Sequence, residues 1–546
     1  MSSISTAVID SVGGADLATV SRRALLAGAG VGALGLAACG RVRSGRASNT
    51  LVVGLTYDID TLNVYSTGFL GDVQAAVVEG LLAPDEHANY VPVLATEVPT
   101  LENGGIVLEG AGMSITYKLR PGVLWHDGRP FTSADVAFTW RAVKNPAFIA
   151  ESKDGTEDIV AIETPDPLTV ICRYKTVSPT FATTLFTFGI LPRHLLEGVD
   201  LNTAPYNERP IGTGPFMVTA FKRGQYVLTE RFPGYWRRDA RGKRLPYLDK
   251  LIFKIIPNSN TLLTQIRSGE LDLVTQTPYD QAKQMHGLPG VELIRAPLLS
   301  WQHLDFNFRN PALADRQVRL AIAHAIDRGP LIRAQGDFPA AITSPVVPVF
   351  DFYDPNVPKI PYDPAKARAV LEAAGYVGKG VRVRNGVPLR FRFLAQAGKG
   401  NDELAQQVII AQLKAIGIDA YADNKTGVSY RQARYTGAYD ITYATWVTGA
   451  DPIYSRFYAT KGSNNGQGYS NPKLDRVLQQ MEGTLDPAER RRAAFEMQRI
   501  LLQDLPSVPL TSNVAVVVKR SALDGFTPNP TNMTPFVGSA FWRWRA

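Results

Sequence analysis

The sequence predicts a protein of mixed α/β class that is built from several domains, and three observations support this prediction. Apolar residues make up 45% of the chain and charged residues 20%, which is typical of soluble globular proteins. The chain has 546 residues, enough for two or three domains around substantial cores. Segments with strand periodicity and segments with helix periodicity follow one another without regular alternation.

Three apolar or alternating segments are expected to form strands. Residues 51–54, Leu-Val-Val-Gly, are a short buried-strand candidate at the start of the folded region. Residues 114–122 alternate between apolar and polar side chains and end in a Pro-Gly turn, which indicates a half-exposed strand. Residues 168–174 are apolar and β-branched, which predicts a strand carrying Cys172. We expect this thiol to be buried and inert.

Capping signals predict where the helices begin. Thr132, with an acidic residue three positions later, forms a capping-box pattern. Asp363 followed by proline predicts a helix that is terminated by Gly375. Residues 315–328 place apolar side chains on one helical face, and residues 486–506 repeat the Asp-Pro start.

Residues 1–38 are typical of an export signal. The run 24–38 has fifteen uncharged residues, whereas a helix that spans a bilayer needs about 20. A basic pair, Arg22 and Arg23, precedes this run and small residues end it, as in signal peptides. Residues 21–26, Ser-Arg-Arg-Ala-Leu-Leu, resemble the twin-arginine signal, which exports proteins already folded.

Residues 36–39, Leu-Ala-Ala-Cys, resemble the bacterial lipobox, in which a lipidated cysteine becomes the mature N-terminus. The small side chains let a peptidase approach, and the sulfur accepts the diacylglyceryl group. We therefore expect Cys39 to anchor an extracytoplasmic protein to the outer face of the cell membrane. One acyl chain binds a membrane only marginally, so stable anchoring takes about two or more signals. The alternative is a cysteine that is buried on an apolar helix.

The net charge of +8 is spread thinly along the chain. The densest basic run, residues 231–244, contains glycines and a proline and is expected to be a surface loop. A nucleic-acid-binding protein would gather its basic residues on one face of a recognisable module, so we expect no nucleic-acid partner. With Cys39 lipidated, Cys172 has no partner for an intramolecular disulfide.

Motifs that would indicate catalysis or a metal site are missing from the sequence. No Gly-x-Ser-x-Gly motif occurs, and residues 398–401 lack the spacing of a phosphate-binding loop. We therefore expect no enzyme activity, no catalytic or metal-binding residue and no cofactor. The six histidines, which lack the spacing of metal ligands, are at positions 87, 126, 194, 286, 303 and 324.

Several segments resemble one family when they are taken in order. Residues 117–140 contain an Arg-Pro-Gly turn, an aromatic-His-Asp-Gly hairpin and a Thr-capped helix, and residues 212–216 read Gly-Thr-Gly-Pro-Phe. Together they resemble the extracytoplasmic solute-binding lipoproteins of peptide/nickel-type ABC importers, bacterial solute-binding protein family 5. The likeness runs from about residue 50 to 546. The other matching segments are 231–236 with 245–273, 306–328 and 362–376.

The resemblance implies a two-lobed, periplasmic-binding-protein-like fold with a hinge and an extra domain inserted into lobe I. The ligand of such a protein is enclosed between the lobes, because contacts to both lobes exist only in the closed state. The implied segments are a signal peptide at 1–38, a lipidated tether at 39–50, lobe I at 51–94, 212–297 and 507–546, an inserted subdomain at 95–211, and lobe II at 298–506.

The resemblance also implies a ligand site late in lobe II, within residues 443–458. Dipeptide and oligopeptide binders of the family hold the peptide's α-ammonium with an aspartate three residues before an Asp-Pro pair. Here the pair begins at Asp451, and the matching position is Thr448. A buried ammonium without a carboxylate costs several kcal/mol. Either Thr448 serves a neutral ligand or Asp451 has taken over the role.

Five further residues are expected at the ligand by resemblance or by position: Phe69, Leu70, Trp301, Trp446 and Tyr454. For each aromatic residue, packing in a core is the alternative. The expected function is that of a monomeric receptor that delivers a peptide or peptide-like solute to the transmembrane subunits of an ABC permease. The alternatives are a non-peptide ligand (a metal chelate, haem or an oligosaccharide), a sensory binding protein and a secreted lipoprotein hydrolase.

Overall fold

A computed structural model describes most of the chain after its first 48 residues. The predicted signal peptide and Cys39 lie outside the described residues. From Ser48 onward the chain forms one compact unit. The residues that the structure describes are 49–67, 71–151, 153, 155–183, 185–451, 453–531 and 534–545.

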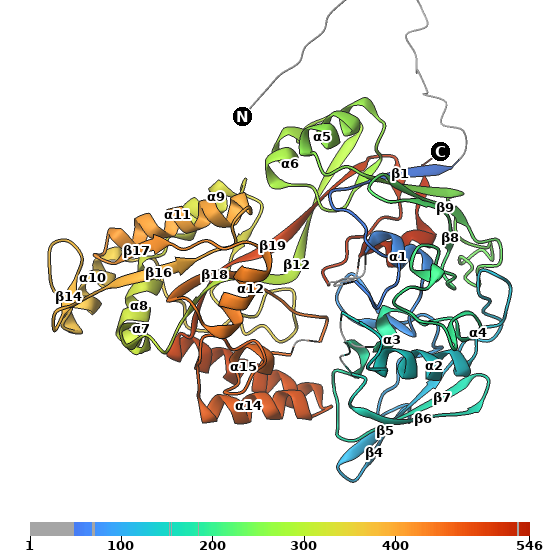
Figure 1. Cartoon of the computed structure of the whole chain (residues 1–546), viewed down its shortest axis with the longest axis horizontal. Coiled ribbons are helices and arrows are strands. Elements are labelled where there is room, and N and C mark those ends of the chain that lie inside the picture. The colour runs from blue at the N-terminus through green and yellow to red at the C-terminus, as the bar shows by residue number, and fades with distance from the viewer. Residues whose placement is uncertain are drawn as a thin grey trace, which may run out of the picture. The chain divides into compact units, whose positions relative to one another are not determined.

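Two long antiparallel strands, β12 (Val291–Phe306) and β19 (Ser507–Arg520), form the middle of a mixed sheet. Figure 1 shows them running between two groups of helices and strands. Within the described residues this sheet has 11 strands, in the order β17-β16-β18-β12-β19-β11-β1-β10-β9-β8, with β13 (Ala340–Ala341) paired to β19. We call the side that contains β1 lobe I and the side that contains β18 lobe II.

Lobe I combines its part of the main sheet with a second, four-stranded antiparallel sheet, β4-β5-β7-β6. Its strands in the main sheet are β1 (Thr50–Leu55), β8 (Phe216–Lys222), β9 (Tyr226–Arg231), β10 (Lys250–Ile255) and β11 (Leu273–Val274). The second sheet consists of β4 (Ile106–Glu109), β5 (Gly112–Lys118), β6 (Ile159–Asp166) and β7 (Thr169–Tyr174). Two short pairs are β2 (Leu82–Pro84) with β3 (Tyr90–Pro92), and β20 (Leu523–Asp524) with β21 (Arg543–Trp544).

The helices on the lobe I side are short, apart from α2 and α5. They are α1 (Asp72–Val77), α2 (Ser133–Lys144), α3 (Leu185–Phe188), α4 (Arg193–Leu196), α5 (Ser259–Ser268) and α6 (Tyr279–Met285). The 3-10 helices are η1 (Phe181–Thr183), η2 (Pro205–Asn207) and η3 (Pro535–Phe541).

Lobe II carries longer helices around three strands of the main sheet. The strands are β16 (Arg390–Leu394), β17 (Asp419–Ala422) and β18 (Ile441–Val447), and a separate hairpin pairs β14 (Val383–Arg384) with β15 (Val387–Pro388). The helices are α7 (Pro311–Ala314), α8 (Arg316–Ala325), α9 (Arg328–Ala334), α10 (Pro364–Ala373), α11 (Gly400–Lys414), α12 (Gly427–Thr436), α13 (Ser455–Tyr458), α14 (Pro472–Gly483) and α15 (Pro487–Asp504).

The two central strands stay paired with each other as they pass from one lobe to the other, but their ladder is interrupted on the way. Residues Val291–Pro297 of β12 pair with the last residues of β19, whereas Trp301–Asp305 pair with its first residues. The ladder is irregular between Pro297 and Trp301, and Trp301 also pairs with Trp446 of β18. A break in a ladder loosens the sheet locally, which suits a hinge. The boundaries given to the lobes from the sequence stay predictions.

The capping signals in the sequence are confirmed by the helix starts. Thr132 and Asp135 form a capping box on α2, and Asp363 accepts a hydrogen bond from the Lys366 backbone at the start of α10. Gly375, just beyond α10, has a φ of +85°, as expected for a helix terminator. The helix expected over 315–328 is shorter than expected: α8 ends at Ala325, because Asp327 caps a new helix, α9.

The Gly-Thr-Gly-Pro-Phe segment is a turn that packs directly on α1. A Cβ atom on Gly212 would lie 1.9 Å from the carbonyl oxygen of Val77, and one on Gly214 would lie 2.6 Å from it. Both distances are far below van der Waals contact, so only glycine fits. The backbone N–H of Gly214 donates to the same carbonyl at 3.0 Å. The strand predicted at 168–174 is confirmed as β7, and Cys172 is a free, fully buried thiol.

Candidate functional site

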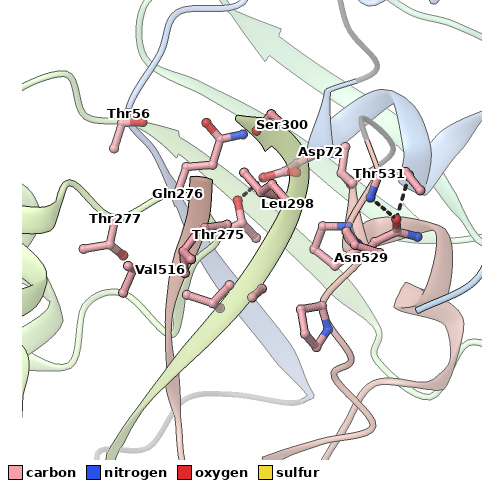
Figure 2. A pocket seen from close by; sticks show the side chains of 18 of the residues that line it. Thr56, Asp72, Thr275, Gln276, Thr277, Leu298, Ser300, Val516, Asn529 and Thr531 are labelled. Atoms are coloured by element: carbon pink, nitrogen blue, oxygen red, sulfur yellow. Dashed lines mark hydrogen bonds between the residues drawn. The ribbon is translucent and has the colours of Figure 1, made fainter. Parts of the chain in front are cut away.

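A cavity of about 620 Å³ lies against the hinge, with walls from both lobes. This volume is within the range of about 300–1,000 Å³ for small-molecule sites. Lobe I contributes Asp72 at the start of α1 and residues 275–279, from the end of β11 to the first residue of α6, and lobe II contributes Asn401 and Val447. Figure 2 shows polar side chains of this cavity, among them Asp72, Thr275 and Gln276. The remaining wall consists of residues 296 and 298–300 of β12, 514–517 of β19, 56–57, 528–531 and 534–535.

The hinge residues that border the cavity are held by a compact set of hydrogen bonds. The Leu299 backbone N–H donates to the Pro530 carbonyl at 2.8 Å, and its carbonyl accepts from the backbone N–H and the hydroxyl of Thr448, at 2.9 and 3.1 Å. The Asn513 side chain donates to the Ser300 hydroxyl at 3.0 Å. A ligand in this cavity therefore contacts the same residues about which the lobes would turn.

Asp72 is the one charged side chain among the described residues that line the cavity. It is 3% exposed, and its Oδ2 accepts a hydrogen bond from the Thr275 hydroxyl at 2.7 Å (Figure 2). Burial raises the pKa of Asp72 to about 6, and hydrogen bonds from the side chains of Thr275 and Thr534 offset this only in part. The carboxyl group therefore changes its charge close to neutral pH.

The other polar groups of the cavity are neutral. The Thr277 hydroxyl is buried and has no hydrogen-bond partner, although the side chain lines the cavity. Buried polar groups nearly always have a partner in native proteins. This hydroxyl is therefore a candidate contact for a bound solute. Gln276 and Ser300 add an amide and a hydroxyl to the same wall.

Three aromatic residues expected at the ligand are packed together inside lobe II. Trp301, Trp446 and Tyr454 belong to one hydrophobic cluster of buried residues. Trp446 stacks on Phe457 with ring centroids 4.2 Å apart, and the Arg434 guanidinium lies 3.6 Å from its ring centroid. None of the three lines the cavity. Their ligand role stays a prediction, and their packing matches the alternative that the sequence left open.

Thr448 and Asp451 also lie beside the cavity rather than in its wall. Thr448 is buried, and its hydroxyl donates to the Leu299 carbonyl. Asp451 forms a two-pronged ion pair with Arg490 of α15, in which one N–O distance is 3.1 Å. Burial raises the pKa of Asp451, and Arg490 counters this effect. The structure thus gives both side chains intramolecular partners.

Some predicted residues cannot be placed, and others were missed. Phe69 and Leu70 lie outside the described residues, as do Arg22, Arg23 and Cys39. Sequence reasoning missed Asp72, Thr275 and Thr277. The only available signal for Asp72 was an acidic residue at the start of a short apolar segment, which is also an ordinary helix start.

The described part of the chain contains neither a membrane-spanning helix nor a cluster of metal-ligating side chains. Among those residues, no helix is both long and apolar enough to cross a bilayer. In the same part of the chain, no group of three or more histidine, cysteine, aspartate or glutamate side chains could hold a metal ion.

A two-lobed fold with a solute-sized cavity at its hinge defines the class of binding proteins that close around a ligand. The model of the bacterial extracellular solute-binding proteins, family 5 (middle region), matches residues 89–468. The chain belongs to this family, and the predicted family and two-lobed α/β fold are confirmed. Members of the family are substrate-binding proteins of ABC importers and act outside the cytoplasm.

Individual relatives match over most of the chain. The oligopeptide-binding protein AppA of Bacillus subtilis is 26% identical over 84% of this chain and 84% of its own length. The glutathione-binding protein GsiB of Escherichia coli is 27% identical over 91% of this chain and 95% of its own. The structure of NikZ from Campylobacter jejuni in complex with Ni(L-His) has a TM-score of 0.75 and 24% identity, and covers 91% of this chain and 99% of NikZ.

Proposed function

We propose that this protein captures a peptide or peptide-like solute outside the cytoplasm and delivers it to the transmembrane subunits of an ABC importer. The observation that carries the proposal is the cavity at the hinge, with walls from both lobes, in a chain that belongs to this family. The names of AppA and GsiB, an oligopeptide and a glutathione binder, support the peptide-like class.

Ligand capture and delivery are linked by the position of the cavity. A solute that contacts lobe I through residues 275–279 and lobe II through Val447 makes its full set of contacts in one relative placement of the lobes. Binding then shifts the population toward that placement by the difference in affinity between the two states. The permease can read this shift as a change in the surface that the two lobes present.

The proposal includes a twin-arginine signal and a lipid anchor. Arg22 and Arg23 direct export of the folded chain, and Cys39 carries the lipid. The sequence patterns support both roles. Export in the folded state suits a chain whose core spans segments far apart in sequence, because β12 and β19 pair across more than 200 positions. The protein acts as a monomer in this proposal.

A deletion strain tests the delivery role. Uptake of radiolabelled peptides is expected to fall when the gene is deleted and to recover when the full chain is restored. Unchanged uptake together with loss of a peptide-dependent transcriptional response would replace delivery by a sensory role. Unchanged uptake of peptides with reduced uptake of a metal chelate or an oligosaccharide would keep the role and change the solute class.

A further inference from the structure

The family resemblance implies that position 448 is the one expected to hold a peptide's ammonium group. It is a threonine, and the Thr448 hydroxyl is already bonded to the Leu299 carbonyl. The nearest acid in sequence, Asp451, is paired with Arg490, and both side chains are 12% exposed. Taking Asp451 from this pair would leave a buried guanidinium uncompensated, which is strongly destabilising. Among the described residues that line the cavity, none from lobe II is an acid.

Lobe I does offer one. Asp72 lines the cavity, and the groups around it are neutral and come from three other segments. The Thr275 and Thr534 side chains hydrogen-bond to its carboxylate, and the Tyr57 hydroxyl accepts from its backbone N–H at 3.5 Å. No lysine, arginine or histidine is among the described lining residues. A buried carboxylate without a cation is costly unless something pairs with it.

We propose that Asp72 is the cation-recognition residue of this protein and that its solutes carry a protonated amine, which the Asp72 carboxylate binds from lobe I. This inference rests on the proposed function and narrows its substrate class. The unpartnered Thr277 hydroxyl, two residues beyond Thr275, which bonds to Asp72, independently points to a ligand in the same wall.

The ammonium group supplies the positive charge that the apo protein lacks. In the apo protein the raised pKa of Asp72 means that a proton partly neutralises the carboxyl group near pH 6. A bound amine replaces this proton, so binding releases a proton from the protein in that pH range. No other acid or base lines the described wall, except the phenols of Tyr57 and Tyr279, whose pKa values are raised by burial.

A mixture of tripeptides tests the proposal. Each tripeptide is present in equal amounts with a free amino terminus and with an N-acetylated one. The full chain is incubated with the mixture, separated from unbound peptide, and the retained peptides are counted by mass spectrometry. The wild-type protein is expected to retain the free-amine form about 10- to 100-fold more than the acetylated form, the range for a hydrogen bond to a charged group. Asp72→Asn is expected to bring this ratio close to one.

Asp280→Asn is the matched control. Asp280 follows the lining residue Tyr279 but is exposed and does not line the cavity, so the same substitution there leaves the ratio unchanged. A loss of the ratio in Asp280→Asn as large as in Asp72→Asn would show a general charge effect and overturn the assignment. Equal retention of both forms by the wild type would overturn the inference and leave peptide binding intact. Retention of neither form would contradict both proposals.

Acidification tests the same contact without a substitution. Because the amine competes with a proton for Asp72, retention of free-amine peptides is expected to fall about tenfold between pH about 7.5 and pH about 5. The small retention of acetylated peptides should not change over this range. A free-amine preference that is the same at both pH values would contradict the role of Asp72, even if the Asn variant failed to fold.

Discussion

At the scale of single residues, Asp72 shows how a binding site can be built at the expense of stability. Its carboxyl group is buried beside two hydroxyl groups, with no cation among the described residues that line the cavity, and its pKa rises from 3.8 to about 6. The neutral form is therefore favoured by folding. The stability that this preference contributes is fully present below pH 3.8 and is lost as the pH rises through about 6.

The substitution Asp72→Asn is expected to stabilise the ligand-free protein at pH about 7.5. The raised pKa corresponds to a cost of about 3 kcal/mol for the charged form, offset by about 1 kcal/mol for the unpaired amide N–H of asparagine. The net gain of about 2 kcal/mol should disappear near pH 4, where the wild-type carboxyl is neutral. Urea unfolding at the two pH values measures it. A loss of stability at pH about 7.5 would contradict the burial of an uncompensated carboxylate.

At the scale of elements, the turn at residues 212–216 packs closely on helix α1 because two of its residues are glycines, which have no side chain. The Val77 carbonyl lies where a Cβ on Gly212 would be. This contact places α1, and with it Asp72 at the first position of the helix, against the lobe I sheet.

Gly212→Ala is expected to destabilise the protein by about 3 kcal/mol or more, because backbone on both sides of a 1.9 Å contact must move. Gly483→Ala is the matched control: Gly483 ends α14, and no atom lies within 4 Å of the Cβ it would gain. That variant should be neutral or stabilised by up to about 1 kcal/mol. Thermal unfolding compares the two, and similar midpoints would refute the close packing of the turn on α1.

The ion pair between Asp451 and Arg490 joins the segment after β18 to helix α15. Asp451→Ala is expected to cost about 3–5 kcal/mol, because it leaves Arg490 buried and unpaired. Replacing both residues, as Asp451→Ala with Arg490→Met, should recover most of this loss. A double variant as unstable as the single one, with peptide retention abolished in both, would instead favour Asp451 as a ligand residue.

The helix starts were predictable because capping is local: Thr132, Asp363 and Asp486 each bond to backbone within three residues. The site was not. Asp72 meets Thr275 across 203 positions, a contact that no local pattern encodes. Trp446 has the aromatic character of a ligand residue and equally that of a core residue, and only its stacking on Phe457 and Arg434 places it in the core of lobe II.

At the scale of the whole molecule, the fold was predictable by resemblance because the matching segments are structural ones. The turn at 212–216 and the capped helices within 117–140 and 362–376 carry the resemblance, and they identify the two-lobed fold without specifying its solute. We expect the solute to be decided by few side chains in the hinge cavity, among which Asp72 is the one charged side chain of the described wall.

The proposed export route makes a prediction for the intact chain. Replacing Arg22 and Arg23 by lysine is expected to block export, because the twin-arginine pathway reads the arginine pair. Export of a prefolded reporter fused to the signal should require the same pair. Cell fractionation measures both, and export of the double-lysine variant at the wild-type level would refute the assignment. Cys39→Ala should abolish lipid labelling, because it removes the sulfur atom that would carry the lipid.

Native mass spectrometry of the protein, purified without denaturation, tests the central claim most directly. The account predicts a bound population of small solutes that carry a free amine, peptides above all, and their loss from the Asp72→Asn variant. Bound solutes that are anionic or lack an amine, retained equally by Asp72→Asn, would contradict it.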